Sequence, residues 1–363
     1  MKQEMLGDVL KYGYLTPRIR GKKSFLLVKG DYDAMLSAES PTAALRRLEG
    51  TRYKPYISQL VLEEFNLSKV EKALVESYQD DVAFVSKSLK EHTAAEFFAE
   101  YGRSLELKAL LGVLKAIILG IPWEEASTYI FPYGRISYDL CQSLVETKNL
   151  KRVLELLKEK HLIRQIEEAL SEVEDPIRRS IIAESFITKH ILSRLWEKAN
   201  ELTGRNKLCI RLLGVQIDTT NMMTILRMKK LGFTAEEISE SLAPVSFKLS
   251  DREMASALQA ATEKDSMKVF TGGFYASTVS PLISVYEVRE DLPIFEVAFK
   301  RLHASECERA FYQPFYLGEA LAYVYLKYYE VKDIIAILTA KYMKLPADKV
   351  EPNLILHQPP YPI

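Results

Sequence analysis

The chain has 363 residues, with 49 basic and 49 acidic side chains, so its formal net charge is zero. A balanced charge creates no general field that would attract nucleic acid or acidic substrates, so nucleic acid is not an expected partner. The length suits about two to three domains, and 48% hydrophobic with 27% charged residues excludes a disordered chain.

The cysteines and the N-terminus indicate where the protein works. Cys141, Cys209 and Cys307 are scattered and form no CxxC pair, which predicts buried free thiols in a reducing cytosol. The first residues, MKQEMLGDVLKYGYL, lack the charged-then-apolar pattern of a secretory signal. The longest apolar run, Leu110–Ile121, contains Lys115 and is too short to cross a bilayer. It predicts a core helix, so any membrane association is expected to be peripheral.

Near the N-terminus, residues 11–28 hold the densest basic cluster, namely Arg18, Arg20, Lys22 and Lys23, beside two tyrosines. One hypothesis is a contact for an acidic partner surface or for lipid headgroups. The alternative is a solvated turn at the start of a helix, which is the usual role of a short run of charges. These four residues are the candidate partner-contact residues of the chain.

The next stretch, Lys29–Thr51, predicts a helix, a break at Ser40-Pro41-Thr42 and a second helix. The same pattern returns at Arg135–Leu157 and at Lys248–Phe270. Between such pairs, residues 55–104, 163–216 and 275–328 carry long helical patterns, such as Leu62–Val75 and Phe84–Tyr101. We interpret these stretches as helices that link one pair to the next.

A second element repeats without gaps. Leu105–Ala126 matches Ile217–Ile238 after a shift of 112 positions, and a second shift of 112 reaches Tyr329–Val350. Apolar residues at spacings of three and four predict an amphipathic helix. Gly120, Gly232 or Lys344 then breaks the helix, and Pro122, Thr234 or Pro346 followed by acids predicts the start of a short second helix.

An acid opens each copy of this second element: Glu106, Asp218 and Glu330. Their regular placement favours one helix-terminus acid in three copies, stabilising the positive end of the helix. Three separate functional sites are the less favoured alternative.

The order of the two elements has a structural consequence. Calling the exact repeat A and the looser helix pair B, the chain runs B, A, B, A, B, A. If each A packs on the B that follows it, the last A must pack on the first B, and the chain closes into a ring. The sequence therefore predicts an all-α fold of three similar domains with a pseudo-threefold arrangement, a ring in which the N- and C-terminal segments meet. The expected domains are residues 1–103, completed by 330–363, then 104–216 and 217–329.

The stretch 311–329, FYQPFYLGEALAYVYLKYY, concentrates tyrosines. A tyrosine-rich helix is typical of a binding face, but it is equally typical of a core helix whose hydroxyl groups reach polar partners. We favour the core helix.

No motif in the chain predicts catalysis. The five histidines do not cluster, and His303 with Cys307 supplies only two of the ligands that a zinc site needs. HExxH, GxSxG, CxxC and the dinucleotide glycine fingerprint are all missing. The sequence predicts a protein that is not an enzyme and that needs no cofactor or metal.

Two phrases carry a resemblance to a known family: LGEALAYVYLKYYEVKDIIAILTAKYMKLPADKVEPNLI at 317–355 and DTTNMMTILRMKKLGFTAEEI at 218–238. They resemble the C subunit of archaeal-type (A/V-type) rotary ATPases, of which the d subunit of eukaryotic V-ATPase is a more distant relative. Asp218 with Asn221 is similar to an Asp-x-x-Asn pattern of that family. The third copy has Glu330 with Asp333, whereas the first has Glu106 with Ala109.

The resemblance implies a non-catalytic central-stalk subunit of the rotor, in which three similar helical domains form a funnel. Such a protein sits on the membrane ring of proteolipid subunits, receives the tip of the shaft formed by the D and F subunits, and transmits torque between ATP turnover and proton or sodium transport. It implies a location on the cytoplasmic face of the cell membrane, peripheral through the ring.

Two alternatives stay open. A stand-alone helical scaffold is the first, although a solenoid has shorter repeats and open ends. An enzyme with an unrecognised site between domains is the second.

Overall fold

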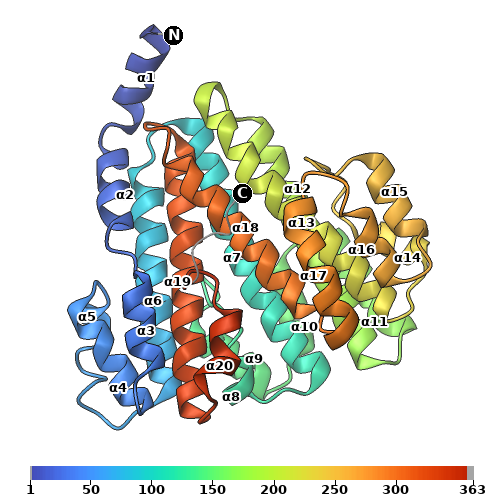
Figure 1. Ribbon diagram of the computed structural model, residues 1–363, viewed down its shortest axis with the longest axis horizontal. Coiled ribbons are helices and arrows are strands. Elements are labelled where there is room, and N and C mark those ends of the chain that lie inside the picture. The colour runs from blue at the N-terminus through green and yellow to red at the C-terminus, as the bar shows by residue number, and fades with distance from the viewer. Residues whose placement is uncertain (1, 358–363) are drawn as a thin grey trace.

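The computed structural model describes residues 2–357 and is all-α, as predicted. Its longest helices are α6 (Leu67–Ser88), α7 (His92–Leu119), α12 (Pro176–Asn200), α13 (Cys209–Lys230) and α19 (Leu317–Tyr342). Within that range the only extended pairing is one isolated antiparallel bridge. In Figure 1, α19 stands between the N-terminal helices and the rest of the molecule, although it comes last among the long helices of the chain.

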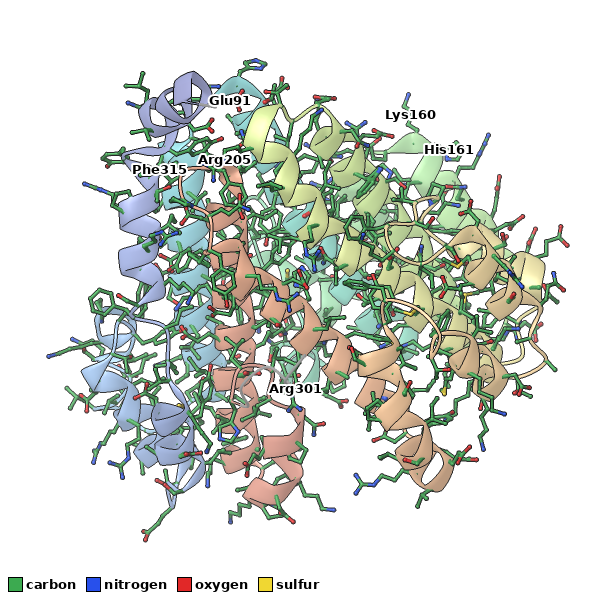
Figure 2. All side chains as sticks on the ribbon, turned by 45° about the horizontal axis from the view of Figure 1, so that its top comes forward. Glu91, Lys160, His161, Arg205, Arg301 and Phe315 are labelled. Atoms are coloured by element: carbon green, nitrogen blue, oxygen red, sulfur yellow. The ribbon has the colours of Figure 1, made fainter. Side chains whose placement is uncertain are left out.

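The shorter helices fill the spaces between these long ones, and α1 projects from one end of the body (Figure 1). In chain order they are α1 (Lys2–Tyr12), α2 (Leu15–Lys23), α3 (Lys29–Leu36), α4 (Pro41–Arg46), α5 (Lys54–Ile57), α8 (Trp123–Ala126), α9 (Tyr138–Glu146), α10 (Leu150–Leu157), α11 (Lys160–Glu172), α14 (Ala235–Ser241), α15 (Asp251–Gln259), α16 (Glu263–Val269), α17 (Ala276–Arg289), α18 (Pro293–Ala310) and α20 (Ala347–Val350), with 3-10 turns at Arg47–Gly50, Gly204–Leu208 and Glu351–Asn353. Figure 2 looks towards the end that carries α1, where Glu91, Arg205 and Phe315 also lie.

Each copy of element A is a long helix, a tight turn and a short helix, as predicted: α7 with α8, α13 with α14, and α19 with α20. The turn places one residue in the left-handed region in every copy, with φ of 68° at Gly120, 73° at Gly232 and 57° at Lys344. Glycine adopts this conformation without steric strain, whereas a lysine does not. The third copy therefore keeps the turn despite its residue.

The short helices start one position later than expected. Pro122, Thr234 and Pro346 have extended backbone and act as N-caps, so they precede the first helical residue. Thr234 accepts a hydrogen bond from the N–H of Glu237, and the side chain of Glu237 accepts one from the N–H of Thr234. This reciprocal pair is a capping box.

The three copies of element B are confirmed as helix pairs: α3 with α4, α9 with α10, and α15 with α16. Ser40 and Thr262, which lie in two of the predicted breaks, accept a backbone hydrogen bond at the start of the second helix. Small polar residues in these breaks therefore act as N-caps.

The linking helices differ from their predicted bounds. α6 begins at Leu67 rather than near Leu62, because Asn66 caps its first turn. The predicted Phe84–Tyr101 helix is interrupted between Ser88 and His92, where the Glu91 carboxylate caps α7. Apolar periodicity continues across this break, so it could not reveal the two ends.

Buried side chains form two clusters. One lies within residues 215–299, and the larger one joins the N-terminal helices, α7, α12 and α19. The tyrosine-rich helix belongs to the larger cluster, with Tyr323 and Tyr325 buried, so the core interpretation is confirmed. Cys141, Cys209 and Cys307 are buried free thiols, as predicted. Within residues 2–357, no helix combines the length and hydropathy needed to cross a membrane.

The last A packs on the first B, as the order of elements predicts. Lys341 of α19 donates a hydrogen bond to the carbonyl of Leu36 at the end of α3. His357 bonds the carboxylate of Asp33 at 2.7 Å, across 324 positions of sequence. Residues 358–363 of the predicted closing segment lie outside the described residues.

Candidate functional site

The three repeated acids lie inside the long helices, at least two turns after each helix begins. The predicted helix-terminus role is therefore wrong, because the repeat match begins well after the start of each helix. Each acid instead accepts hydrogen bonds from backbone N–H groups that lead into a B element. These donors are Arg135 for Glu106, then Phe247, Lys248 and Leu249 for Asp218, and Leu27 for Glu330. Charge-assisted bonds of this kind fix the backbone more strongly than neutral ones.

The residue three positions after the acid holds a second backbone segment. Asn221 accepts from the N–H of Ala243 at 3.0 Å and donates to its carbonyl at 3.1 Å. Asp333 accepts from the N–H groups of Ile355 and Leu356 at 2.7–3.0 Å. Ala109 of the first copy has no polar group for this task.

We call the hydrogen bonds from the repeated acid, and from the residue three positions later, to the backbone a clamp. Comparison of the second and third clamps shows how the chain closes. In the second copy, Asn221 and Asp218 hold one continuous connector, residues 243–249. In the third copy, Asp333 holds residues 355–356 near the C-terminus, and Glu330 holds Leu27 near the N-terminus. The two ends of the chain together therefore replace the connector that is continuous in the second copy.

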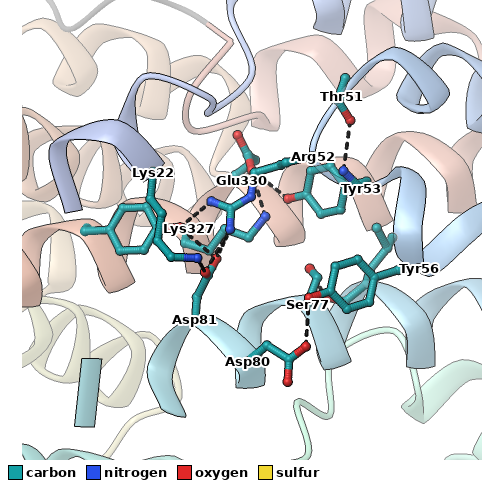
Figure 3. A network of polar contacts seen from close by, with 12 residues as sticks. Lys22, Thr51, Arg52, Tyr53, Tyr56, Ser77, Asp80, Asp81, Lys327 and Glu330 are labelled. Atoms are coloured by element: carbon teal, nitrogen blue, oxygen red, sulfur yellow. Dashed lines mark hydrogen bonds and ion pairs between the residues drawn. The ribbon is translucent and has the colours of Figure 1, made fainter. Parts of the chain in front are cut away.

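We name the contact of α19 with residues 27–53 the closing joint (Figure 3). Glu330 accepts from the Tyr53 hydroxyl at 2.6 Å and from Lys327 Nζ at 3.1 Å. Lys327 also lies 3.7 Å from the centre of the Tyr53 ring. The side chains of Lys327 and Glu330 are completely buried. Tyr275 makes the corresponding bond to Asp218, at 2.7 Å.

A second carboxylate, Asp81 of α6, ties the joint to its neighbours. It accepts hydrogen bonds from Arg52, Lys22 and Tyr323 at 2.6–2.8 Å. Burial would raise the pKa of Asp81, but Arg52 and these hydrogen bonds outweigh burial and leave the pKa lowered. Asp81 is therefore a charged acceptor shared by three elements.

Burial shifts two other groups of α19 towards their neutral forms. It lowers the pKa of Lys327 to about 8, although Glu330 acts in the opposite direction. It raises the pKa of Asp333 to about 7, although the backbone donors at Leu356 and Ile355 oppose the shift. Desolvation disfavours the charged form in both cases.

The four predicted contact cations have different environments. Arg20 pairs with Glu319 at 2.6 Å, Lys22 with Asp81 at 2.8 Å and Lys23 with Glu308 at 2.6 Å. Arg18 is exposed and stacks on the Tyr14 ring, 4.2 Å from its centre. Three of the four thus form ion pairs within the chain, and their role in partner contact stays a prediction.

Sequence reasoning missed Arg52, Asp81, Tyr323 and Lys327. One signal was available, since Lys327 interrupts a long apolar stretch of α19 and stands three positions before Glu330. Charged residues are rarely buried unless they are paired. The other three meet across separations of 29 to 271 positions, which no local pattern encodes.

A polar cavity of about 310 Å³ lies where α7, α12, α13, α18 and α19 meet. Glu184 bonds Lys115 at 2.6 Å, and Glu296 bonds Lys300 at 2.6 Å and also pairs with Arg227. The lining residue Lys108 has its pKa lowered to about 8 by burial. Each of the two acids thus has cationic partners.

The described residues include one histidine–cysteine contact but no candidate metal site. No group of three or more His, Cys, Asp or Glu side chains among residues 2–357 is placed to hold a metal ion. Cys307 Sγ lies 3.9 Å from His303 Nδ1. Burial raises the pKa of Cys307 and lowers that of His303 to about 4, so neither forms the ion that a nucleophilic pair requires.

The family model and the similar known proteins all point to the same family. The family model for the ATP synthase (C/AC39) subunit matches residues 15–352. The C subunit of the A-type ATP synthase from Methanocaldococcus jannaschii is 24% identical, over 97% of this chain and 88% of the relative. The subunits of the same name from Pyrococcus furiosus and Methanobrevibacter smithii are 25% and 23% identical, over 95% and 91% of this chain and 89% and 84% of the relatives.

Proposed function

The chain belongs to the ATP synthase (C/AC39) subunit family, and from this premise we propose that it is the central-stalk component that joins the shaft to the membrane rotor of an A/V-type ATP synthase. It binds the D and F subunits of the shaft on one side and the proteolipid ring on the other. Torque passes through it between ATP turnover and the transport of protons or sodium. The protein itself is not catalytic.

The closing joint is the observation that supports this role best. A part that transmits torque must not open where its chain begins and ends. Here the two ends are held by Glu330, Asp333 and the Asp33–His357 pair. Because Glu330 and Lys327 are fully buried, water does not weaken their attraction as it does on a surface. The closing joint therefore stiffens the molecule at the contact between the two ends of the chain, where no short covalent connector holds them together.

The arrangement of the repeats supports the same role. We propose that residues 1–103 with 330–363, residues 104–216 and residues 217–329 are three similar units around a pseudo-threefold axis. The repeated helices α7, α13 and α19 all line the same polar cavity, as helices around a common axis would. A ring or funnel of this kind offers two opposite ends, one for the shaft and one for the proteolipids.

The proposal also gives the location and the candidate contacts. The protein would lie on the cytoplasmic face of the membrane, held there through the proteolipid ring. Arg18, with Arg20, Lys22 and Lys23 beside it, is the proposed contact for an acidic surface of a partner. Contacts of this type supply orientation and association rate through complementary charge.

Reconstitution tests the proposal. Purified D–F shaft and detergent-solubilised proteolipid ring are mixed with and without the chain and separated by gel filtration. We expect the shaft to elute with the ring only when the chain is present, and to separate as salt rises. A well-folded chain that binds neither component would contradict the proposal and favour a stand-alone scaffold.

A further inference from the structure

A basic pocket opens at the end of the molecule near α1. It is formed by α2, by the last turns of α6 and by the segment that follows them, and its volume is about 390 Å³. We call it the basic pocket. Its lining residues are Tyr14, Arg18, Phe84, Lys87, Ser88 and Lys90.

The cations of the basic pocket differ from their neighbours in sequence. Arg18, Lys87 and Lys90 are exposed, and none of them forms an ion pair with another described residue. The acid next to Lys90 in the sequence, Glu91, is occupied in capping α7 through the N–H groups of Thr93 and Ala94. Three positive charges thus face the same opening without a negative partner.

Part of this charge has a local explanation. Lys87 lies in the last turn of α6, where a cation stabilises the negative end of the helix. That effect does not account for Arg18, which comes from α2, or for Lys90, which lies beyond the helix. The convergence of three segments on one opening therefore points to a ligand with negative charge.

Apolar surface adjoins the charges. Tyr14 is 53% exposed and its ring lies against Arg18, and Phe84 also lines the pocket. On the projecting helix α1, Leu10 is 80% exposed and Val9 is 38% exposed. Aromatic and aliphatic side chains beside cations are typical of protein–protein contacts.

The distribution of charge favours a protein over a polyanion. Nucleic acid and anionic membranes are bound by many cations spread over a wide face. Here the chain as a whole has no net charge, and Arg18, Lys87 and Lys90 surround one opening of about 390 Å³, which fits only a few side chains. A segment with two or three carboxylates and some apolar residues matches this surface.

We propose that the basic pocket docks an acidic, amphipathic segment of a neighbouring protein of the assembly, whose carboxylates pair with Arg18, Lys87 and Lys90. Its apolar side chains would cover Tyr14 and the exposed face of α1. This inference rests on the proposed function, since the neighbouring protein is one of the rotor components. It extends the proposed contact from Arg18 to Lys87 and Lys90, while Arg20, Lys22 and Lys23 beside it also form ion pairs within the chain.

Charge reversal tests the pocket. The variant Arg18→Glu, Lys87→Glu, Lys90→Glu is compared with the control Lys54→Glu, Lys151→Glu, Lys160→Glu, which changes three exposed lysines that form no ion pair. Figure 2 shows Lys160 well away from Glu91, which follows Lys90. Binding to the D–F shaft and to the proteolipid ring is measured at several salt concentrations, and far-UV circular dichroism and the melting temperature report folding.

We expect the pocket variant to bind one of the two components at least about tenfold more weakly than the control, with a flatter dependence on salt. Lys87→Arg with Lys90→Arg should retain normal binding, because the charge is kept. If the pocket variant misfolds, the neutral variant Arg18→Gln, Lys87→Gln, Lys90→Gln gives the same comparison with less repulsion.

Three results would overturn the inference. Equal binding of the pocket and control variants to both components would contradict the pocket alone and leave the proposed function standing. Binding of the wild type to phosphatidylserine vesicles that only the pocket variant loses, with binding to shaft and ring unchanged, would assign the pocket to a membrane surface. A wild-type chain that binds neither component would contradict the proposed function and the pocket together.

Discussion

The closing joint and the contact between α7 and residues 133–137 are built around the same repeated acid, yet they differ in almost every other respect. Glu330 and its partner Lys327 are fully buried, whereas the side chain of Arg135, which pairs with Glu106, is 60% exposed. The acid and the backbone it holds are 303 positions apart in the closing joint and 29 apart in the other.

This difference follows from chain connectivity. Short-range contacts are brought together by the chain itself, so a weak, solvated ion pair is sufficient there. Nothing covalent holds the N-terminal helices against α19, and the buried network supplies that link instead. Connectivity is not the whole cause, because Asp218 of the second copy is buried and accepts a hydrogen bond from Tyr275 although the backbone that it holds is only 29 to 31 positions away.

The largest expected effect comes from breaking the closing joint. Glu330→Ala leaves the cation of Lys327 buried without its acid and removes the acceptors of Tyr53 and Leu27. Removing one partner of a buried pair costs about 3–5 kcal/mol, and we expect a loss of that size in the free energy of unfolding, measured by urea denaturation. The matched control is Glu106→Ala, and equal losses in the two variants would contradict the comparison.

The next effect concerns the C-terminal clamp. Asp333→Ala leaves the N–H groups of Ile355 and Leu356 without acceptors, at a cost of about 1–3 kcal/mol. We expect faster limited proteolysis in the segment after Val350 as well as lower stability. Asp333→Asn introduces the residue type found at Asn221 and should recover part of the loss. An unchanged rate of proteolysis in Asp333→Ala would show that Asp333 does not fix residues 355–356 in place.

Glu71 of α6 is buried and has no ion-pair partner among the described residues, and it gives a pH-dependent prediction. Burial raises the pKa of Glu71 to about 7, although Ser127 and Lys332 act in the opposite direction. The folded state thus holds a proton that the unfolded chain releases near its ordinary pKa of about 4.3, so this group lowers stability as pH rises from there to about 7.

Glu71→Gln should therefore leave stability unchanged at acidic pH and raise the free energy of unfolding at mildly alkaline pH, by about 2–4 kcal/mol. Thermal unfolding at about pH 4, 6 and 8, on either side of the two pKa values, measures this difference. A stabilisation that is the same at all three values would contradict the assigned ionisation.

A smaller effect tests the equivalence of the three turns. Lys344 has a φ of 57° where the other copies have glycine. Lys344→Gly should raise the free energy of unfolding by about 1 kcal/mol, because glycine removes the strain at this φ. Gly120→Lys is the reciprocal change and should lower stability by a similar amount. A loss of stability in Lys344→Gly would mean that the lysine side chain has a role of its own.

The smallest effect is expected at the short-range contact. Glu106→Gln keeps an acceptor for the N–H of Arg135 but removes the exposed ion pair, so the loss should stay below about 1 kcal/mol. High salt should reduce even this difference between variant and wild type. A loss as large as that of Glu330→Ala would show that exposure does not separate the two contacts.

The repeated units of the fold were predictable from the sequence, because each unit is defined by local signals. Apolar spacing indicated the helices, and the residues at positions 120, 232 and 344 indicated the turns. The role of the acids was missed, since periodicity identifies the face of a helix but not its first residue. Once the helices begin earlier, Glu106, Asp218 and Glu330 become interior residues that hold a distant backbone.

The candidate contacts were predicted only in part for a related reason. A run of basic residues shows charge density but not the acids that oppose it in space. Glu319, Asp81 and Glu308 come from other helices and pair with three of the four predicted cations. The other cations of the basic pocket, Lys87 and Lys90, are distant from Arg18 in the sequence and form no run with it.

Amide hydrogen exchange tests the closing joint most directly. Peptides covering residues 24–28 and 353–357 report the amides held by Glu330 and Asp333, and a peptide covering 133–137 reports the amide held by Glu106. We predict that the amides held in the first two peptides exchange slowly, because their exchange requires global unfolding. The amide held in the third peptide should exchange faster, through local opening. Exchange at residues 24–28 as fast as at 133–137 would show that the chain ends separate in the native state, and it would contradict the closing joint.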